Sequence, residues 1–444
     1  MWEGLYAPTS AMKTFAWKKL SASARAAALR RPAQAAQPVV AAAVRTIIAA
    51  VRRDGDAALR RLTRKFDGVV LRSLRVTEAE FAAAGKALSR ADKAALRTAC
   101  RNIHTFHAAQ RPRALRLETT PGIVCEKTVR PIGCVGLYVP GGSAPLPSTA
   151  LMLGVPSQLA GNPVRVLCTP PDKLGRINPW ILCAARLCGI TEAFKLGGTQ
   201  AIAAMAYGTA SVPKCDKLFG PGNAFVTEAK QQVARDAAGA AIDLPAGPSE
   251  MLVIADHRAN PAFVAADLLS QAEHGPDSQV VLVTFSQSFA ARVQTALAKQ
   301  LATLPRAAIA RRALERSRIF LVTGRTEAVE IANCYAPEHL ILQVAGPRAM
   351  LADITTAGSV FLGAWTPESL GDYASGTNHV LPTYGWARAC SGLGLADFQR
   401  TMTVQTASRA GLQKLGPVVE RLALAEGLAA HQRAVRVRLD KISR

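Results

Sequence analysis

Apolar residues in the first hundred positions recur at helical spacing. Val40, Val44, Ile47, Ile48 and Val51 follow one another at helical intervals, with basic residues between them. A period of three to four residues gathers apolar side chains on one face of a helix. The pattern therefore predicts a helical region from about Ser21 to about Arg111.

From Cys125 onward, short β-rich runs alternate with helical segments. One series of apolar runs occupies 135–139, 164–168, 193–196 and 217–219, and most of these runs end in a glycine turn. A second series occupies 251–254, 280–283, 319–322, 340–342 and 360–362. Strand, turn and helix in repeated succession are typical of a parallel α/β sheet.

The two series predict an α/β fold with two Rossmann-like doubly wound domains, one inserted in the other. A chain of 444 residues is long enough for more than one core. We expect an N-terminal extension and arm at 1–27, a first α/β domain formed by 28–137 with 250–388, and an inserted domain at 138–249. An N-terminal helical region and an extended C-terminal arm at 389–444 complete the prediction, because the alternation fades after Leu381.

Composition indicates a cytoplasmic protein without membrane association. No apolar run reaches the roughly 18 residues that a spanning helix needs, and the N-terminus lacks the apolar core of a secretory signal. A transit peptide is the alternative interpretation of this Ala- and Arg-containing start. The nine cysteines lack C-x-x-C spacing and lie mostly in apolar runs, which favours buried, reduced thiols.

The net charge of +23 raises the question of nucleic-acid binding. The arginines are spread along helical patterns, and aromatic residues make up only 5% of the chain, which leaves little material for base stacking. We therefore expect no specific nucleic-acid partner, and a mostly solvated basic surface that attracts anions.

Gln271 and His274 are the first candidate ligands for a metal. They lie one helical turn apart after the apolar run 263–269, on one face, where an amide oxygen and an imidazole nitrogen are available together. Gly275 and Pro276 are expected to end this helix with a left-handed cap. A solvated helix end with a histidine near the dipole is the commoner explanation of such a pair on its own.

Other polar clusters follow apolar strands. Glu338 and His339 place an acid and a base at a strand entry, although a surface turn also explains them. The stretch 368–379 is rich in Gly, Ser and Thr and contains Asp372 and His379. We interpret His104 and His107 as surface histidines of a basic helix, outside any site.

Three glycine turns follow strands of the first series, at 140–142, 197–200 and 220–223. Such turns expose backbone N–H groups and helix N-termini at the carboxyl ends of strands, where open α/β sheets bind ligands. None matches G-x-G-x-x-G, so a phosphate or nucleotide site and plain tight turns remain equal alternatives.

Several longer motifs together resemble the L-histidinol dehydrogenase family. They are G-P-G-N-A-F-V-T-E-A-K at 220–230, D-L-P-A-G-P-S-E at 243–250, and the segments 270–278, 337–340 and 371–383. The likeness runs in order from about Lys13 to the C-terminus. It implies a zinc- and NAD-dependent four-electron oxidation of L-histidinol to L-histidine, the last step of histidine biosynthesis. It also implies a homodimer with shared active sites.

By position, the resemblance implies one Zn²⁺ per subunit. Its ligands would be Gln271, His274 and Asp372, with His431 supplied by the other subunit. The implied acid–base residues are Glu338 and His339. The implied NAD contacts are Tyr138, Gln200 and Asn223. Substrate contacts fall on Ser249, His379 and Glu426, besides Gln271, His274, His339, Asp372 and His431. The sequence departs from the family in a short N-terminal extension and a few residues around 173–176.

Two alternatives stay open at this point. One is a relative that oxidises another small alcohol on the same scaffold, against which the presence of His379, Glu426 and His431 argues. The other is a basic nucleic-acid-binding protein, which a salt titration against RNA distinguishes from an enzyme that forms NADH.

Overall fold

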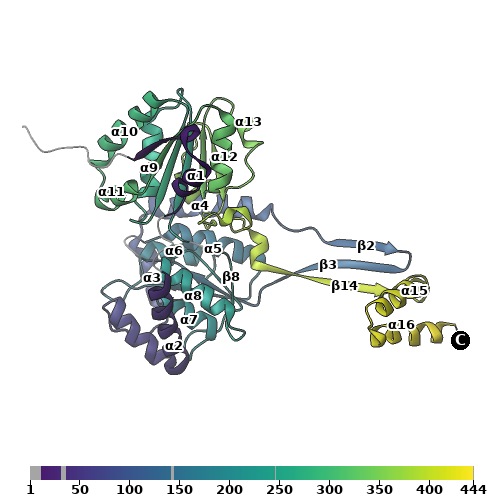
Figure 1. Cartoon of the computed structure of the whole chain (residues 1–444). Helices are drawn as coiled ribbons and strands as arrows, with labels where there is room; N and C mark the ends of the chain where they lie inside the picture. Colours follow the sequence, from purple (N-terminus) through teal and green to yellow (C-terminus); the bar gives the residue numbers. More distant parts are fainter. Residues whose placement is uncertain (1–11, 32–36, 142–144, 246, 444) are drawn as a thin grey trace, which may run out of the picture.

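The computed structural model describes residues 12–31, 37–141, 145–245 and 247–443. Two α/β units stack on each other, and a long arm projects from the region between them (Figure 1). Each unit is built on a parallel sheet, so the predicted α/β class with parallel sheets is confirmed. In the described part of the chain, no helix is both long and apolar enough to cross a membrane.

The first unit contains a six-stranded parallel sheet in the order β1-β11-β10-β9-β12-β13. Side chains alternate between its faces: Met251 and Val253 join one apolar cluster, whereas Leu252 and Ile254 join the other. The strands are β1 (Lys13–Ala16), β9 (Glu250–Ala255), β10 (Gln279–Thr284), β11 (Arg318–Leu321), β12 (His339–Gln343) and β13 (Ser359–Leu362).

Helices cover both faces of this sheet. On one face lie α9 (Pro261–Ala272), α10 (Gln287–Leu301) and α11 (Ala307–Glu315). The other face is covered by α12 (Arg325–Tyr335) and α13 (Pro347–Leu351), with α1 (Ala22–Ala28) and the buried Trp17 beside them. The short helix α14 (Glu368–Tyr373) follows β13 and contacts α9. Strand β1 means that the expected N-terminal extension contributes to this sheet.

The second unit contains a five-stranded parallel sheet in the order β6-β5-β4-β7-β8. Its strands are β4 (Cys134–Tyr138), β5 (Val164–Thr169), β6 (Glu192–Lys195), β7 (Lys217–Phe219) and β8 (Ala241–Ile242). On one face lie α3 (Glu78–Ala87), α4 (Arg90–Ala108), α5 (Pro147–Ala160) and α6 (Pro179–Leu187). On the other lie α2 (Gln37–Phe66), α7 (Gly198–Tyr207) and α8 (Ala224–Arg235).

The packing of α2, α3 and α4 differs from the expected domain boundaries. We expected residues 28–137 to join the unit of 250–388, but the apolar stripe of α2, including Val44 and Leu59, packs against α7 and α8. The reason is that a parallel sheet must bury both faces, and the helices within 138–249 cover only part of each face.

The arm contains a three-stranded antiparallel sheet that the sequence pattern did not predict. It consists of β2 (Leu115–Thr120), β3 (Ile123–Pro131) and β14 (Gln399–Ala407), in the order β14-β3-β2. At its far end lie α15 (Arg409–Ala425) and α16 (Ala429–Ile442), well away from both units (Figure 1). Residues 115–131 therefore belong to the arm together with 399–442 of the expected segment 389–444, whereas Leu393, Leu395 and Phe398 are buried in the core of the second unit.

Candidate active site

His339 is the centre of a buried polar cluster at the amino end of β12. Its side chain is buried, and its Nδ1 lies 2.8 Å from Gln271 Nε2, 3.5 Å from Glu368 Oε1 and 3.7 Å from Glu338 Oε2. Its Nε2 lies 3.3 Å from Asp372 Oδ1. Ligand atoms of His339, Glu368 and Asp372 all lie within 4.8 Å of one another, a spacing that a metal ion can bridge.

Gln271 enters this cluster from the last turn of α9. Its Nε2 donates to the backbone oxygen of Glu250 at 3.3 Å, while its fully buried Oε1 has no hydrogen-bond partner. An unpaired buried acceptor is uncommon and calls for a ligand or a cation. The amide oxygen is therefore available for a metal.

His274 lies just beyond the end of α9. The helix ends at Ala272, Glu273 caps it in a right-handed conformation, and Gly275 has no positive φ. The expected left-handed glycine cap was thus wrong, because the Glu273 N–H already bonds to the Leu269 oxygen. His274 Nδ1 lies 3.2 Å from Ser249 Oγ, which brings these two predicted residues together.

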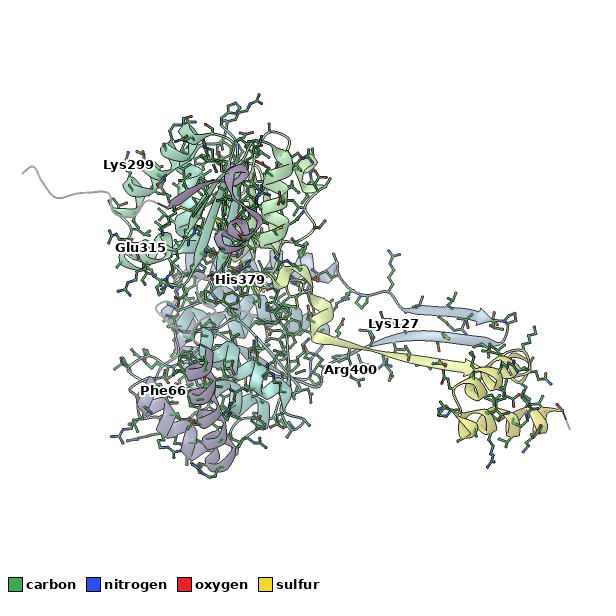
Figure 2. All side chains as sticks on the ribbon, in the orientation of Figure 1. Phe66, Lys127, Lys299, Glu315, His379 and Arg400 are labelled. Atoms are coloured by element: carbon green, nitrogen blue, oxygen red, sulfur yellow. The ribbon has the colours of Figure 1, made fainter. Side chains whose placement is uncertain are left out.

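Asp372 and His379 approach from the segment after β13. His379 Nδ1 donates to the backbone oxygen of Asp372 at 2.8 Å, so its Nε2 accepts from the Thr149 hydroxyl at 3.1 Å. Thr149 belongs to α5 of the other unit, and Figure 2 shows His379 between the two units. Asn378 also donates to the Met152 oxygen of α5 at 2.8 Å. The site therefore lies where the two units meet.

Glu338 is buried and held by one backbone bond. Its Oε2 accepts from the Glu250 N–H at 2.8 Å. Glu250 is itself buried and paired with Arg31, whose guanidinium also donates to the Tyr335 oxygen at 2.6 Å. These bonds fix the start of β9, whose Glu250 backbone bonds to the side chains of both Glu338 and Gln271. Glu338 was predicted as a site residue from its motif, whereas no sequence pattern had pointed to Glu250 or Arg31 as one.

The pKa values of His339, Glu368 and Asp372 are shifted by burial and by the charges of neighbouring groups. Burial alone would lower the pKa of His339, but Glu368 and Glu338 nearby raise that pKa well above its usual range. Burial raises the pKa of Glu368 to about 8, with Asp372 adding to the effect and His339 opposing it. For Asp372, burial raises the pKa, but the His339, His379 and His274 imidazoles bring it below its usual value. The site therefore favours positive charge at its centre.

The His274 imidazole is accessible, yet the protein around it displaces much of its water. This desolvation lowers the pKa of His274, although Asp372 and Glu338 act in the opposite direction. A lowered pKa keeps the ring neutral near pH 7, which is the form that binds metals.

Two predicted site residues do not join the cluster within one chain. Glu426 caps the C-terminal end of α15 and His431 lies in α16, both exposed at the far end of the arm. Apolar side chains around them are exposed as well, among them Leu422 at 61%, Leu424 at 54% and Val437 at 54%. His107, in contrast, is fully buried in α4 and bonds to the Ile103 oxygen, so its interpretation as a surface histidine was wrong.

The three predicted cofactor contacts lie at the carboxyl edge of the five-stranded sheet. Tyr138 ends β4, and its hydroxyl accepts from the Gly198 N–H at 2.9 Å, which links two of the glycine turns. Gln200 is buried in the first turn of α7. Asn223 caps α8 by accepting from the Phe225 and Val226 N–H groups, so its amide nitrogen stays available for a ligand.

The third turn lies directly beside Tyr138. Gly220 has a φ of +121°, and a side chain there would collide with the backbone oxygen of Tyr138. This turn is held by Asp243, whose Oδ2 accepts from the Gly220 N–H at 2.8 Å and whose Oδ1 pairs with buried Lys230. Strands β4 and β7 are neighbours, but the chain continues from β4 to β5 on one side and from β7 to β8 on the other. The carboxyl ends of β4 and β7 therefore form a topological switch point, the place at which open α/β sheets bind ligands.

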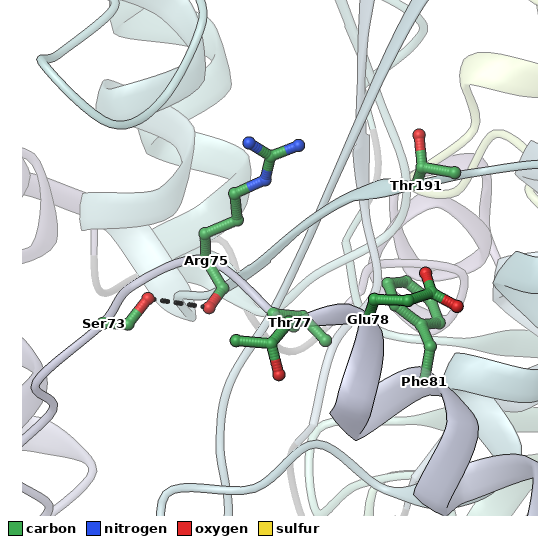
Figure 3. Close-up of a pocket in the computed structure, with 7 residues that line it drawn as sticks. Ser73, Arg75, Thr77, Glu78, Phe81 and Thr191 are labelled. Atoms are coloured by element: carbon green, nitrogen blue, oxygen red, sulfur yellow. Dashed lines mark hydrogen bonds between the residues drawn. The ribbon is translucent and has the colours of Figure 1, made fainter.

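Two surface hollows lie away from these residues. One has a volume of about 350 Å³ and is lined by Ser73, Arg75, Glu78, Phe81 and neighbours near the start of α3 (Figure 3). The other, about 470 Å³, runs along α16 between Ala429 and Val437. Neither contains a residue of the cluster.

The comparisons with known proteins agree with the motifs. The family model for histidinol dehydrogenase matches residues 29–439. Histidinol dehydrogenase from Xanthomonas campestris pv. campestris (strain 8004) is 60% identical over 428 residues, covering 96% of this chain and 99% of that protein. The enzyme from Vibrio parahaemolyticus serotype O3:K6 is 57% identical over 432 residues, covering 97% and 99%.

A crystal structure of a relative also has a similar fold. The crystal structure of histidinol dehydrogenase from Elizabethkingia anophelis is similar with a TM-score of 0.93 and 47% identity. The match covers 98% of this chain and 99% of that one. The chain therefore belongs to the histidinol dehydrogenase family of oxidoreductases.

Proposed function

We propose that this protein oxidises L-histidinol through L-histidinal to L-histidine, with zinc and two molecules of NAD, in the last step of histidine biosynthesis. The observation that carries the proposal is the convergence of Gln271, His274, Asp372 and His339 at one cluster, in a chain of this family. We assign the protein to the cytoplasm.

The residues present fit a zinc ion. Gln271 Oε1 is a buried acceptor without a partner, and Asp372 and His274 lie close enough to perturb each other's pKa. These three would hold the ion together with His431 of the partner subunit. When bound, zinc supplies open coordination positions that orient the substrate amine and imidazole. Ser249, His379 and Glu426 would complete the substrate contacts.

His339 serves as the base in the first oxidation. It takes the proton of the substrate hydroxyl while the carbon loses a hydride to NAD, which yields the aldehyde. The Glu368 and Glu338 carboxyl oxygens, 3.5 Å and 3.7 Å from its Nδ1, support this role, because they lie where they can compensate the charge that the ring gains. The proton passes to solvent before the next step.

Glu338 serves as the base for water in the second step. It takes a proton from a water molecule that attacks the aldehyde carbon, and His339 then removes a hydroxyl proton from the hydrated aldehyde as the second hydride leaves. The carboxylate of Glu338 is anchored by the Glu250 N–H, which fixes its direction. Two NAD molecules are reduced for each histidinol.

The NAD site is proposed at the carboxyl edge of the five-stranded sheet. Tyr138, Gln200 and Asn223 lie on the three glycine-containing turns of this edge. We further propose that both units are Rossmann-like and doubly wound, with the five-stranded unit inserted between β1 and β9. The strand orders support this. When β1 is left out and the other strands of each sheet are renumbered from one in chain order, both sheets have the order 3-2-1-4-5, which is typical of doubly wound folds.

The decisive measurement is the yield of NADH per histidinol consumed. A yield of two, with histidine as product, is expected from the zinc-loaded protein. A yield of one, with accumulation of histidinal, would show that the reaction stops at the aldehyde. A panel of other small alcohols, assayed in parallel, distinguishes a relative with a different substrate.

A further inference from the structure

Glu368, the first residue of α14, has no assigned role. Its side chain is almost fully buried, with 1% of its surface exposed. The Ser270 hydroxyl lies 3.0 Å from its Oε2 and also contacts the Asp267 oxygen at 2.7 Å. Its Oε1 points to the His339 ring, 3.5 Å from Nδ1, and has no hydrogen-bond partner. One carboxyl oxygen is thus anchored and the other faces the proposed base.

The other two acids near His339 are engaged elsewhere. Glu338 accepts the Glu250 N–H and lies 3.7 Å from His339 Nδ1. Asp372 faces Nε2, on the opposite side of the ring, and is a proposed zinc ligand. Glu368 is therefore the acid that lies nearest to Nδ1 among the described residues.

A purely structural role explains Glu368 poorly. Among the described ion pairs, His339 is its only basic partner. A carboxylate buried without an arginine or lysine destabilises a fold, and an amide or apolar side chain of similar size fills the same space without that penalty. The imidazole beside it accounts for an acid at this position, because the unpaired Oε1 faces the ring.

We propose that Glu368 is a positioning residue for His339. Anchored by Ser270, it holds the imidazole in the orientation that faces Asp372, and its unpaired Oε1 faces Nδ1 at 3.5 Å while the ring carries the substrate proton. A buried acid beside a catalytic histidine serves the same purpose in hydrolase triads. The inference rests on the proposed role of His339 as the base.

The first test is Glu368→Gln in the full-length, zinc-loaded protein. We expect kcat to fall about 10- to 100-fold, within the range of a weakened general base, while KM for histidinol, the zinc content and Tm stay close to the starting values. Zinc loss in parallel with activity would instead make Glu368 a metal ligand and overturn the proposal. Unchanged kcat would overturn it too. The exposed Glu315→Gln, on α11, is the matched control (Figure 2).

The second test is a double-mutant cycle with His339→Asn. If Glu368 acts through His339, adding Glu368→Gln to His339→Asn should lower the residual rate by less than about 2-fold. Multiplicative losses would contradict the proposal, since Glu368 would then act independently. A fully active His339→Asn variant would instead refute the base itself, so the two failures are distinguishable. Ser270→Ala, which releases only the anchor, should lower kcat several-fold with zinc retained.

Discussion

At the scale of single residues, the charge around His339 determines what the site can hold. Three carboxyl groups surround one imidazole, and a buried amide oxygen beside them has no partner. Burying several like charges is unfavourable unless a cation or a proton compensates them. The arrangement therefore favours both a metal ion and a histidine that gains a proton during the reaction.

His274→Ala should abolish zinc binding and turnover. The variant loses a neutral imidazole at the accessible rim of the cluster, and the remaining ligands, two oxygens and His431 of the partner subunit, hold zinc weakly. Zinc content after dialysis and the rate of NADH formation test this expectation. His104→Ala is the control because His104 is exposed, whereas His107 is buried and its replacement would destabilise α4. Zinc retained by His274→Ala would exclude His274 as a ligand.

Glu338→Gln and His339→Asn should affect the two oxidations differently. Glu338→Gln should slow oxidation of supplied histidinal by about 10²-fold or more but leave oxidation of the alcohol largely intact, since only the aldehyde step needs an activated water. His339→Asn should slow both steps, because each hydride departure requires a proton to leave an oxygen. Single-turnover NADH formation from each substrate measures the two rates. Equal losses for Glu338→Gln would mean that Glu338 only orients His339.

Asp267→Asn should change how stability depends on pH. Burial raises the pKa of Asp267 to about 7, with Gln343 opposing the shift. Between its ordinary value and pH 7, the folded state holds a proton that the unfolded state has lost, so the free energy of unfolding falls as pH rises. Asparagine cannot ionise. The variant should therefore gain about 1 kcal/mol or more over the native protein between pH 5 and pH 8 in denaturant titrations. Exposed Asp440→Asn should show no such gain, and a pH-independent difference would contradict the assignment.

The residues of the site divide into those the sequence could reveal and those it could not. Glu338 and His339 stand together in a motif beside proline, and Gln271 and His274 share a helical spacing. Glu368 follows Pro367 at the start of a short helix, where an acid is ordinary. Glu368 and His339 are 29 residues apart in the chain and meet only in the folded protein, so no local sequence pattern predicts their contact.

At the scale of elements, apolar content decided which strands were predictable. The nine predicted strands, buried in parallel sheets, were recovered within about two residues because such strands are continuous apolar runs. Strands β2 and β14 were missed because they are polar and largely exposed on both faces. The Pro121–Gly122 turn between β2 and β3, with Gly122 at a φ of +87°, was the one available hairpin signal.

Lys230→Met should test how the turn at 220 is held. The Lys230 ammonium donates to the Gly220 oxygen at 2.9 Å and pairs with Asp243, both deep in the unit. Removing one member of a buried pair leaves the other charge uncompensated, which costs about 3–5 kcal/mol. Chemical denaturation should show that loss, together with a higher KM for NAD because the turn lies at the proposed cofactor edge. Exposed Lys299→Met serves as the control, and an unchanged unfolding free energy would contradict the pairing (Figure 2).

At the scale of the whole molecule, the arm leaves apolar side chains exposed in a single chain. Its sheet carries exposed charged side chains such as Lys127 and Arg400, whereas α15 and α16 expose several leucines and valines (Figure 2). Exposed apolar clusters of this kind mark interaction sites. Helical periodicity predicted a terminal helix but not its distance from the sheets, because that distance depends on the long strands β3 and β14, which no apolar pattern marks.

Co-expression of Gln271→Ala with His431→Ala tests whether the arm completes the site of a partner. Each variant alone should be inactive, since every site in its homodimer lacks one ligand. In a mixed dimer with shared sites, one site collects both defects and the other collects none, so mixed dimers should regain up to about half of the native activity per dimer. Differently tagged chains allow the mixed dimers to be isolated, and their zinc content should rise to about one ion per dimer. Within one chain, α16, which contains His431, lies at the tip of the arm, far from α9, which contains Gln271 (Figure 1), so restoration cannot come from either chain alone. Mixed dimers that form but stay inactive and free of zinc would show that His431 serves its own subunit or none.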